Sequence, residues 1–571
     1  MSPAIPARLL TPLLLLVCTL PAAAQDTTGT SGKLNPSFTA PVSIPVSPAM
    51  DDSTKSGTRP LPKFDLPEFV ITGTSVIDLP DGEKQSPLLR ALDAPPLSAP
   101  TNARDRAPDV QPDQLLQSPP ALRPTGGLSG GVEASVGTYF SPELRGWIGN
   151  ADPSMSVHAG AGYRRTAGWM PYSDRSGADV RAGAEVPVQS SIPLLDQGVV
   201  RAGGAYTFDQ YQFYGSLHPD VHREVSDLNL AFGFRNFTVA ELPFDIALVL
   251  GNTVVQDSST GVHQQAFGLN IRSVFDAEGL PVDLEFGVSS ASLSDQLTAH
   301  LSSFHIGATT RWLAAPSLVL TGGAAVWSLQ GMGGQNTLRV LPRIRAEYSG
   351  TPVGMVYAAF EPDARFVTLR TLIDQNPYVL SRSDIKHAND TQKWLIGAET
   401  RWFGALRTVV EVSYTTTGDR SIPIDSASAG VWTIRYEDVR TLKGVATAVA
   451  KFTANDYFAC GLTMRSVRGS VSGTHVPYEP SLEADVWHEH HWTGRLATSA
   501  GLKFCSRRDA VPTGNVQLPS CVLLNARASY EWLKNFRVFV EGRNLADQKI
   551  VWWRNYPDRP FSLFIGLTVN W

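Results

Sequence analysis

The sequence predicts an all-β protein: a transmembrane antiparallel up-and-down β-barrel of roughly 22 strands, preceded by a disordered Pro-rich arm. Three observations predict this fold. Apolar and polar residues alternate with a period of two, short and long connections alternate between these segments, and Trp residues recur just before short turns. Residues 129–571, at about 20 residues for each strand with its connection, accommodate roughly 22 strands.

The composition excludes several other classes. The chain has 571 residues, 48 Lys+Arg and 53 Asp+Glu, a net charge of −5 and only 18% charged residues. A nucleic-acid-binding protein is usually basic, so no nucleic-acid partner is expected. A polytopic helical membrane protein needs apolar runs of about 20 residues, and none follows the N-terminus. The 13 Trp, 15 Tyr and 24 Phe are too many for a wholly disordered chain.

Residues 1–24 have the pattern of a signal peptide. A short basic start reaches Arg8, an apolar core covers residues 9–20, and Ala22, Ala23 and Ala24 precede Gln25. The apolar core is too short to span a bilayer, so we expect cleavage and export.

Residues 25–128 are predicted to form a disordered periplasmic arm. Of the 41 prolines in the chain, 17 lie between Asp26 and Leu128, and this stretch contains neither Trp nor Tyr. Such a composition buries too little apolar area to offset the entropy of ordering. Residues 66–74 interrupt it with a β-branched run. On spacing alone this run is either a strand that adds to the sheet edge of another protein or a hydrophobic patch in a linker.

Residues 129–571 carry the period of two. The last predicted strand, 561–571, has apolar side chains at every odd position, and Phe564 is the single exception at an even one. A soluble sandwich shows the same period, so the connections decide the fold. Those near residues 314–316, 403–405 and 533–535 are short, whereas residues 418–430, 467–480, 506–520 and 545–559 form long ones.

Trp residues mark the rim at which the short turns lie. Trp312, Trp402 and Trp532 each precede a short turn, where an aromatic ring would meet the lipid headgroups. The lipid bilayer is therefore the first predicted partner. Because lipid cannot satisfy the N–H and C=O groups of an edge strand, we expect the first strand, residues 130–139, to pair with residues 561–571.

Residues 474–571 resemble the end of the barrel of TonB-dependent outer-membrane receptors. The motifs that carry the resemblance are Val476-Pro477-Tyr478-Glu479-Pro480, Arg507-Arg508, Asn544-Leu545-Ala546-Asp547 and Tyr556-Pro557-Asp558-Arg559. Upstream, Asn376-Pro377-Tyr378 and the hairpin at 391–414 are similar to the middle of that barrel. The resemblance implies a location in the outer membrane of a Gram-negative cell.

Two short segments resemble recognition signals of the same family. Gly566, Val569 and Trp571 resemble the C-terminal signal that the barrel-assembly machinery reads, although Phe564 and the terminal Trp depart from the commoner pattern. The arm contains a segment similar to a TonB box, which implies binding to a TonB-like energy transducer. Its residues are Glu68, Phe69, Val70, Ile71, Thr72, Gly73 and Thr74.

The sequence departs from the family where a globular plug is expected. Only the Pro-rich residues 75–128 separate the box-like segment from the barrel. A barrel of this size without a plug would be an open pore. The arm could fill the lumen, a separate protein could plug it, or the barrel could be a passive channel.

The predicted function is solute uptake across the outer membrane without a standard plug. The alternatives are a passive porin-like channel, or a structural or assembly protein that docks a periplasmic or membrane partner. No nucleophile elbow or phosphate-binding loop is present, so an enzyme is not expected.

The remaining candidate sites involve histidine and cysteine. In a strand, His488 and His490 would share a face and could bind a transition metal. We interpret His488, Glu489, His490 and His491 instead as a polar turn between strands 481–487 and 493–504, so neither a metal nor a cofactor is expected. Cys505 and Cys521 flank a loop at the ends of neighbouring strands, which predicts a disulfide in an oxidising compartment. Cys460 remains a free thiol.

Overall fold

The computed structural model describes residues 127–571, apart from residues 153, 237–242, 259, 296–297, 352–353, 403–404, 427–428 and 454. The predicted signal peptide, the box-like residues 66–74 and all but the last two residues of the predicted arm lie outside this range.

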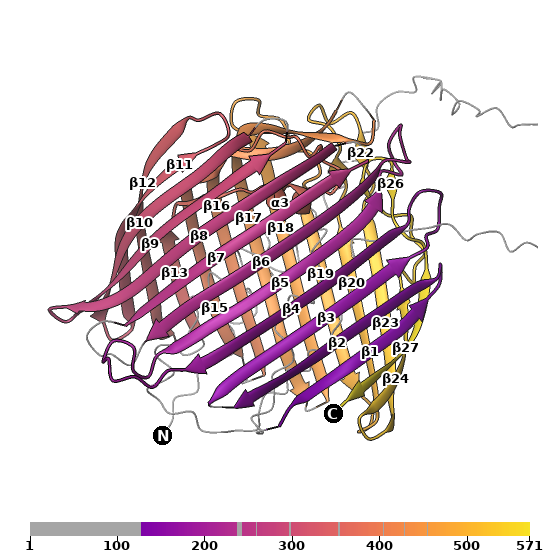
Figure 1. Cartoon of the computed structure of the whole chain (residues 1–571), viewed down its shortest axis with the longest axis horizontal. Coiled ribbons are helices and arrows are strands. Elements are labelled where there is room, and N and C mark those ends of the chain that lie inside the picture. The colour runs from indigo at the N-terminus through magenta and orange to yellow at the C-terminus, as the bar shows by residue number, and fades with distance from the viewer. Residues whose placement is uncertain are drawn as a thin grey trace, which may run out of the picture. The chain divides into compact units, whose positions relative to one another are not determined.

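The described chain forms a closed barrel of 22 antiparallel strands (Figure 1). Strands that follow one another along the chain pair with one another around the ring. Strand β1 then closes the ring by pairing with β27, from Gly131 opposite Asn570 to Gly137 opposite Phe564. The predicted fold class and the predicted closure are both confirmed.

The barrel strands differ widely in length. In chain order they are β1 Ser129–Gly137, β2 Ser141–Asp152, β3 Met155–Thr166, β4 Arg175–Pro187, β5 Val199–Gln212, β6 His222–Asn236, β7 Phe244–Asp257, β8 Thr260–Ala277, β9 Leu280–Ser294, β10 Thr298–Ala315, β11 Leu318–Gln330, β12 Asn336–Thr351, β13 Gly354–Phe360, β15 Ala388–Trp402, β16 Leu406–Asp425, β17 Trp432–Thr453, β18 Asp456–Gly469, β19 Leu482–His491, β20 Leu496–Cys505, β23 Cys521–Leu533, β24 Phe536–Arg543 and β27 Ser562–Asn570.

The connections contain further short elements. These are β14 Asp363–Arg365, α3 Leu369–Gln375, β21 Arg508–Asp509, β22 Gln517–Leu518, β25 Val551–Trp553 and β26 Tyr556–Pro557. Among the described residues, no helix is long and apolar enough to cross a membrane.

The period of two separates an apolar outer face from a polar inner face. On β27, Ile565 is 58% exposed on the outside, whereas Ser562 and Thr568 are buried on the inside. Phe564 also faces inward and is fully buried, with the guanidinium groups of Arg543 and Arg559 3.8 and 4.9 Å from its ring centroid. A Cβ on the opposing Gly137 would overlap this ring, so the glycine makes room for the exception in the pattern.

The two rims differ in their connections. We call the end at which β1 begins and β27 ends the short-turn rim, and the other end the long-loop rim (Figure 1). Trp312 and Trp532 are 54% and 62% exposed on the outer face at the short-turn rim, where the sequence predicted them. The alternation is less regular than predicted, because residues 188–198 form a long connection at the short-turn rim.

Two predicted boundaries are wrong. Strand β16 continues to Asp425, so the connection predicted at residues 418–430 shrinks to 426–431, because residues 420–425 pair with β17. The predicted turn at His488–His491 is part of β19, since these residues pair with both β18 and β20.

We expect an arginine on the outer face to destabilise the barrel. Ile396 is 68% exposed on the outside of β15, and an arginine near the middle of a bilayer costs about 2–4 kcal/mol. Ile396→Arg should lower the free energy of unfolding by that amount in urea titrations of vesicle-embedded protein. Lys393→Gln, on the inner face of the same strand, is the control and should change it little. An equally small effect of Ile396→Arg would mean that water covers this face.

Candidate functional site

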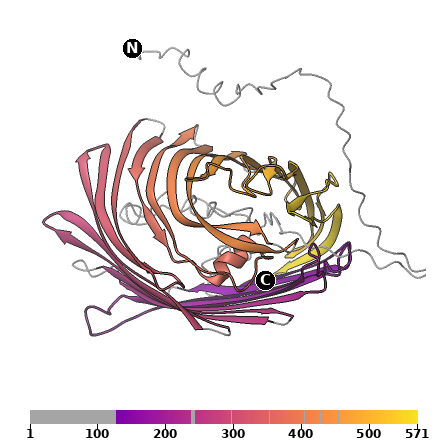
Figure 2. The same cartoon turned by 90° about the horizontal axis from the view of Figure 1, so that it is seen from above.

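The connection between β13 and β15, residues 361–387, folds into the barrel. We call it the inner segment. It carries α3, which lies within the ring of strands when the barrel is seen from above (Figure 2). The helix begins because the side chain of Thr368 accepts a hydrogen bond from the backbone N–H of Thr371 at 3.3 Å.

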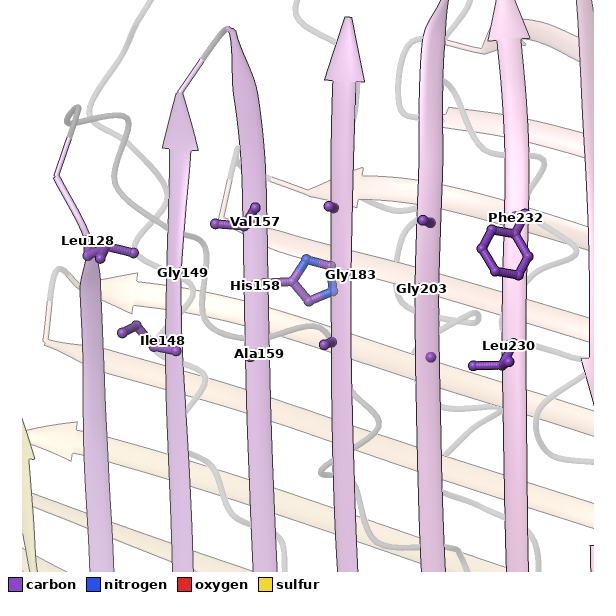
Figure 3. Close-up of a pocket in the computed structure, with 14 residues that line it drawn as sticks. Leu128, Ile148, Gly149, Val157, His158, Ala159, Gly183, Gly203, Leu230 and Phe232 are labelled. Atoms are coloured by element: carbon purple, nitrogen blue, oxygen red, sulfur yellow. The ribbon is translucent and has the colours of Figure 1, made fainter.

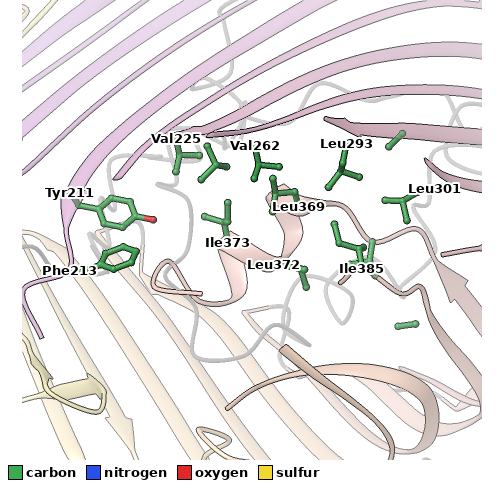
Figure 4. Packing of buried hydrophobic residues seen from close by; sticks show 14 residues of the cluster. Tyr211, Phe213, Val225, Val262, Leu293, Leu301, Leu369, Leu372, Ile373 and Ile385 are labelled. Atoms are coloured by element: carbon green, nitrogen blue, oxygen red, sulfur yellow. The ribbon is translucent and has the colours of Figure 1, made fainter. Parts of the chain in front are cut away.

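The buried face of α3 packs against the inner wall of the barrel. Leu369, Leu372 and Ile373 are buried and belong to one apolar cluster with side chains from several strands (Figure 4). The labelled strand residues of this cluster are Tyr211 of β5, Val225 of β6, Val262 of β8, Leu293 of β9 and Leu301 of β10. An inner wall that would otherwise be polar is therefore apolar where the helix covers it.

Arg223 of β6 anchors the inner segment to the wall. Its fully buried guanidinium donates hydrogen bonds to both carboxylate oxygens of Asp257, at 2.6 and 2.8 Å. It also donates to the carbonyl oxygens of Pro377 at 2.8 Å and Val379 at 2.6 Å. The hydroxyl of Tyr211 donates to the same Pro377 oxygen at 2.7 Å. A buried arginine requires this degree of pairing, because an unpaired buried charge is costly.

An aromatic cluster joins the inner segment to the other connections of the long-loop rim. Its members are Tyr214, Tyr378, Trp432, Tyr478, Trp553 and Tyr556. Tyr378 of the inner segment stacks on Tyr556 with ring centroids 3.7 Å apart, and Tyr478 lies 4.6 Å from Trp553. The indole N–H of Trp432 donates to the hydroxyl of Tyr478, which donates to Asp425, each at 3.0 Å.

The tyrosines of this cluster stay neutral. Burial raises the pKa of Tyr214, Tyr478 and Tyr556 well above the ordinary value, and the nearby Asp425 carboxylate adds to the effect at Tyr478. The phenols therefore keep their protons as hydrogen-bond donors. One such donor is the hydroxyl of Tyr556, which reaches the carbonyl oxygen of Gly430 at 2.8 Å.

Ion pairs line the inner wall across the closure between β1 and β27. Arg527 of β23 donates to both oxygens of Glu133 on β1, at 3.2 and 2.8 Å. Arg543 of β24 does the same with Glu143 of β2, at 2.7 and 2.9 Å. These bidentate pairs skip over intervening strands, so they tie the two ends of the barrel together from inside.

Comparison with solved structures identifies the fold. The barrel is similar to the copper transporter OprC, with a TM-score of 0.61 and 11% identity over 78% of this chain and 80% of that chain. It is also similar to the ferripyoverdine receptor of the outer membrane of Pseudomonas aeruginosa, with a TM-score of 0.61 and 12% identity over 79% of this chain and 72% of that chain.

A third similar structure is the FrpB iron transporter from Neisseria meningitidis, with a TM-score of 0.63 and 8% identity over 78% of this chain and 82% of that chain. The barrel has the fold of the TonB-dependent receptors. No family model and no curated protein matches the chain in sequence. The resemblance inferred from the motifs is thus confirmed for the receptor barrel.

The structure brings the predicted cysteines together. Cys505 and Cys521 are directly opposed residues of β20 and β23, both buried, and both are free thiols in this structure. Their disulfide stays a prediction. Gly566 and Val569 lie on β27 and Trp571 directly follows it, so their role as an assembly signal also stays a prediction.

Sequence reasoning missed the inner segment. Residues 369–375 lack the period of two, and a long stretch without alternation between two predicted strands was the available signal. Arg223 and Asp257 had no local signal, because each lies more than a hundred residues from its partner in the inner segment: Arg223 donates to the carbonyl oxygen of Pro377, and Asp257 accepts from the hydroxyl of Ser381.

A hollow of about 520 Å³ lies on the outer wall of the receptor barrel (Figure 3). Small residues form its floor: Ala159, Ala182, Ala184, Ala202 and Gly204, on neighbouring strands. The larger side chains of Ile148 and Phe232 lie at its sides. These residues share the outward face with exposed Val180 and Tyr206, so the hollow lies on the outer face of the barrel and not in its interior.

We expect Arg223→Ala to release the inner segment. Removing one partner of a buried ion pair costs about 3–5 kcal/mol, so local opening of the inner segment should become at least about 100-fold more frequent. Trypsin cleavage at Arg370, Arg382 or Lys386 of the folded protein should accelerate accordingly, as measured by mass spectrometry of timed digests.

The control for this experiment is Arg272→Ala. Arg272 also pairs with an aspartate, Asp283, but it is 67% exposed, and exposed pairs contribute little. Cleavage of Arg223→Ala at the rate of Arg272→Ala would show that Arg223 does not hold the segment.

Proposed function

We propose that this protein is an outer-membrane transporter for the uptake of a solute, and that its own inner segment closes the long-loop end in place of a standard plug. The observation that carries the proposal is the anchoring of residues 361–387 inside the barrel by Arg223 and Asp257. A segment held in the lumen by a buried ion pair narrows the passage, which favours a closed transporter over a wide open pore.

The chemistry of the wall supports the location and the orientation. The outer face carries exposed apolar side chains such as Ile344, Ile396 and Ile565, and the similar structures are outer-membrane receptors and transporters. Barrels of this kind have short turns in the periplasm and long loops outside. The inner segment and the aromatic cluster would then face the medium.

The chain before the barrel would carry the signals for export and for energy transfer. Residues 1–24 act as a cleaved signal peptide, residues 25–128 form a periplasmic arm, and residues 66–74 bind a TonB-like transducer. The barrel, residues 129–571, is inserted by the barrel-assembly machinery through its C-terminal signal. A separate plug or other periplasmic partner completes the closure if the inner segment alone does not.

The similar structures suggest which cargo to test first. They are a copper transporter, a ferripyoverdine receptor and an iron transporter. We propose a metal ion or a metal chelate as the transported solute, and growth under copper or iron limitation is the assay.

Removing the inner segment should open the barrel. We expect the full protein to show little conductance in planar bilayers, and a variant with residues 366–385 replaced by a short Gly-Ser linker to conduct several-fold more. The matched control replaces residues 511–515, which lie between β21 and β22, and should stay closed. A full protein that conducts as strongly as the linker variant would refute closure by the segment, as would a folded linker variant that stays silent.

Deleting residues 66–74 should abolish uptake while leaving the barrel intact. If these residues contact a transducer, uptake of the cargo should fall to the level of a strain without the protein, because the transport energy no longer reaches the barrel. Surface amount and heat-modifiable gel mobility should be unchanged. Normal uptake by the deletion variant would exclude energised transport through this segment and favour the passive or assembly alternatives.

A further inference from the structure

A group of metal-ligating side chains lies on β18 and β19, far from the inner segment. Asp456 is directly opposite His490 in the antiparallel pairing of these strands, and His488 lies two residues before His490 on β19. Because alternate residues of a strand share a face, both histidines lie on one side of the sheet with the Asp456 side chain. A turn is predicted for these histidines from the sequence, and the structure instead continues β19 through them.

This face is the outside of the barrel. Val486 and Ala484 continue the row of His488 and His490 on β19, and Phe458 continues that of Asp456 on β18. The opposite face of β19 carries Glu483, which pairs with Arg465 of the inner wall. The group lies at the short-turn rim, where β18 begins and β19 ends.

The ligand atoms of the three side chains converge. His490 Nδ1 lies 2.5 Å and His488 Nε2 3.7 Å from Asp456 Oδ1, and all three ligand atoms lie within 4.8 Å of one another. Ligands bound at about 2.0–2.2 Å in a tetrahedral zinc site lie roughly 3.4 Å apart. Side-chain rotations that shift the ligand atoms by about 1 Å would therefore place all three at coordination distance from one ion.

The surroundings suit a metal site. Thr453 donates a hydrogen bond to the other carboxylate oxygen of Asp456, Oδ2, at 2.6 Å, which orients the carboxylate and leaves Oδ1 toward the histidines. The three side chains are 24–50% exposed, so an ion can enter from solution. Trp492, 62% exposed, packs its ring 4.5 Å from that of His490 and marks the depth of the lipid headgroups.

We propose that Asp456, His488 and His490 bind a divalent transition-metal ion of the zinc class on the outer face of the short-turn rim. Two imidazoles and one carboxylate favour such ions over calcium or magnesium, which prefer all-oxygen sites. The fourth position is left to water or to a phosphate of the surrounding lipid. Bound metal would join β18 to β19 next to the connection that links β17 to β18.

The test is zinc binding by the purified full-length protein in detergent. Isothermal titration should show one Zn²⁺ per chain. Both Asp456→Asn and the double variant His488→Ala/His490→Ala should bind Zn²⁺ at least about tenfold more weakly. The first replaces the carboxylate ligand by a neutral amide, and the second removes both imidazole ligands. Co²⁺ in the same site should give a ligand-field spectrum without a thiolate charge-transfer band, which separates this site from the cysteines.

The matched control is His491→Ala. His491 is the next residue of β19, but it faces the other side and lies 3.0 Å from Glu489. Its replacement should leave zinc affinity unchanged. The proposal is overturned if His491→Ala weakens binding as much as the double variant, if the double variant and Asp456→Asn both bind like the unaltered protein, or if cobalt reports thiolate ligands.

Discussion

The pairing of β1 with β27 is the constraint on which the rest of this structure depends. No water in the hydrocarbon layer can satisfy the backbone groups of an unpaired edge, so the first and last strands must meet. Side chains reinforce this closure from the inside, where Arg527 holds Glu133 and Arg543 holds Glu143 across it. Phe564 fills the space above Gly137 at the end of the same pairing. Closure is therefore a property of both the backbone and the inner wall.

Closing 22 strands creates an interior that the chain must also stabilise. Part of this stabilisation is polar, because charged side chains on the inner wall form ion pairs across strands. The other part is the inner segment, whose apolar face covers Val225, Val262 and Leu293. Arg223 connects the two parts, since it is fully buried yet bound to Asp257 and to two backbone carbonyl groups. The inner wall and the inner segment are thus complementary in both their apolar and their polar contacts.

The sequence predicts what depends on local periodicity and fails where distant residues meet. The faces of β27 and β23, the closing pair and the rim of Trp312 and Trp532 all follow from a period of two. The same period runs through Val486, His488 and His490, and the structure follows this strand pattern rather than the predicted turn. The anchoring of Pro377 by Arg223 had no such signal, because tertiary contact alone brings the two together.

Opening of the long-loop end would be a coupled event. The inner segment contributes Tyr378 to the aromatic cluster and its carbonyl groups to Arg223, so it moves only if both contacts break. Breaking a buried ion-pair site costs about 3–5 kcal/mol, and an aromatic pair adds about 0.5–1.5 kcal/mol. Shifting an equilibrium by roughly 5.5 kcal/mol requires about 10⁴-fold tighter binding to the open state. On the proposed function, a solute that opens the long-loop rim must therefore bind the open state much more tightly than the closed one, or the energy must come from another source.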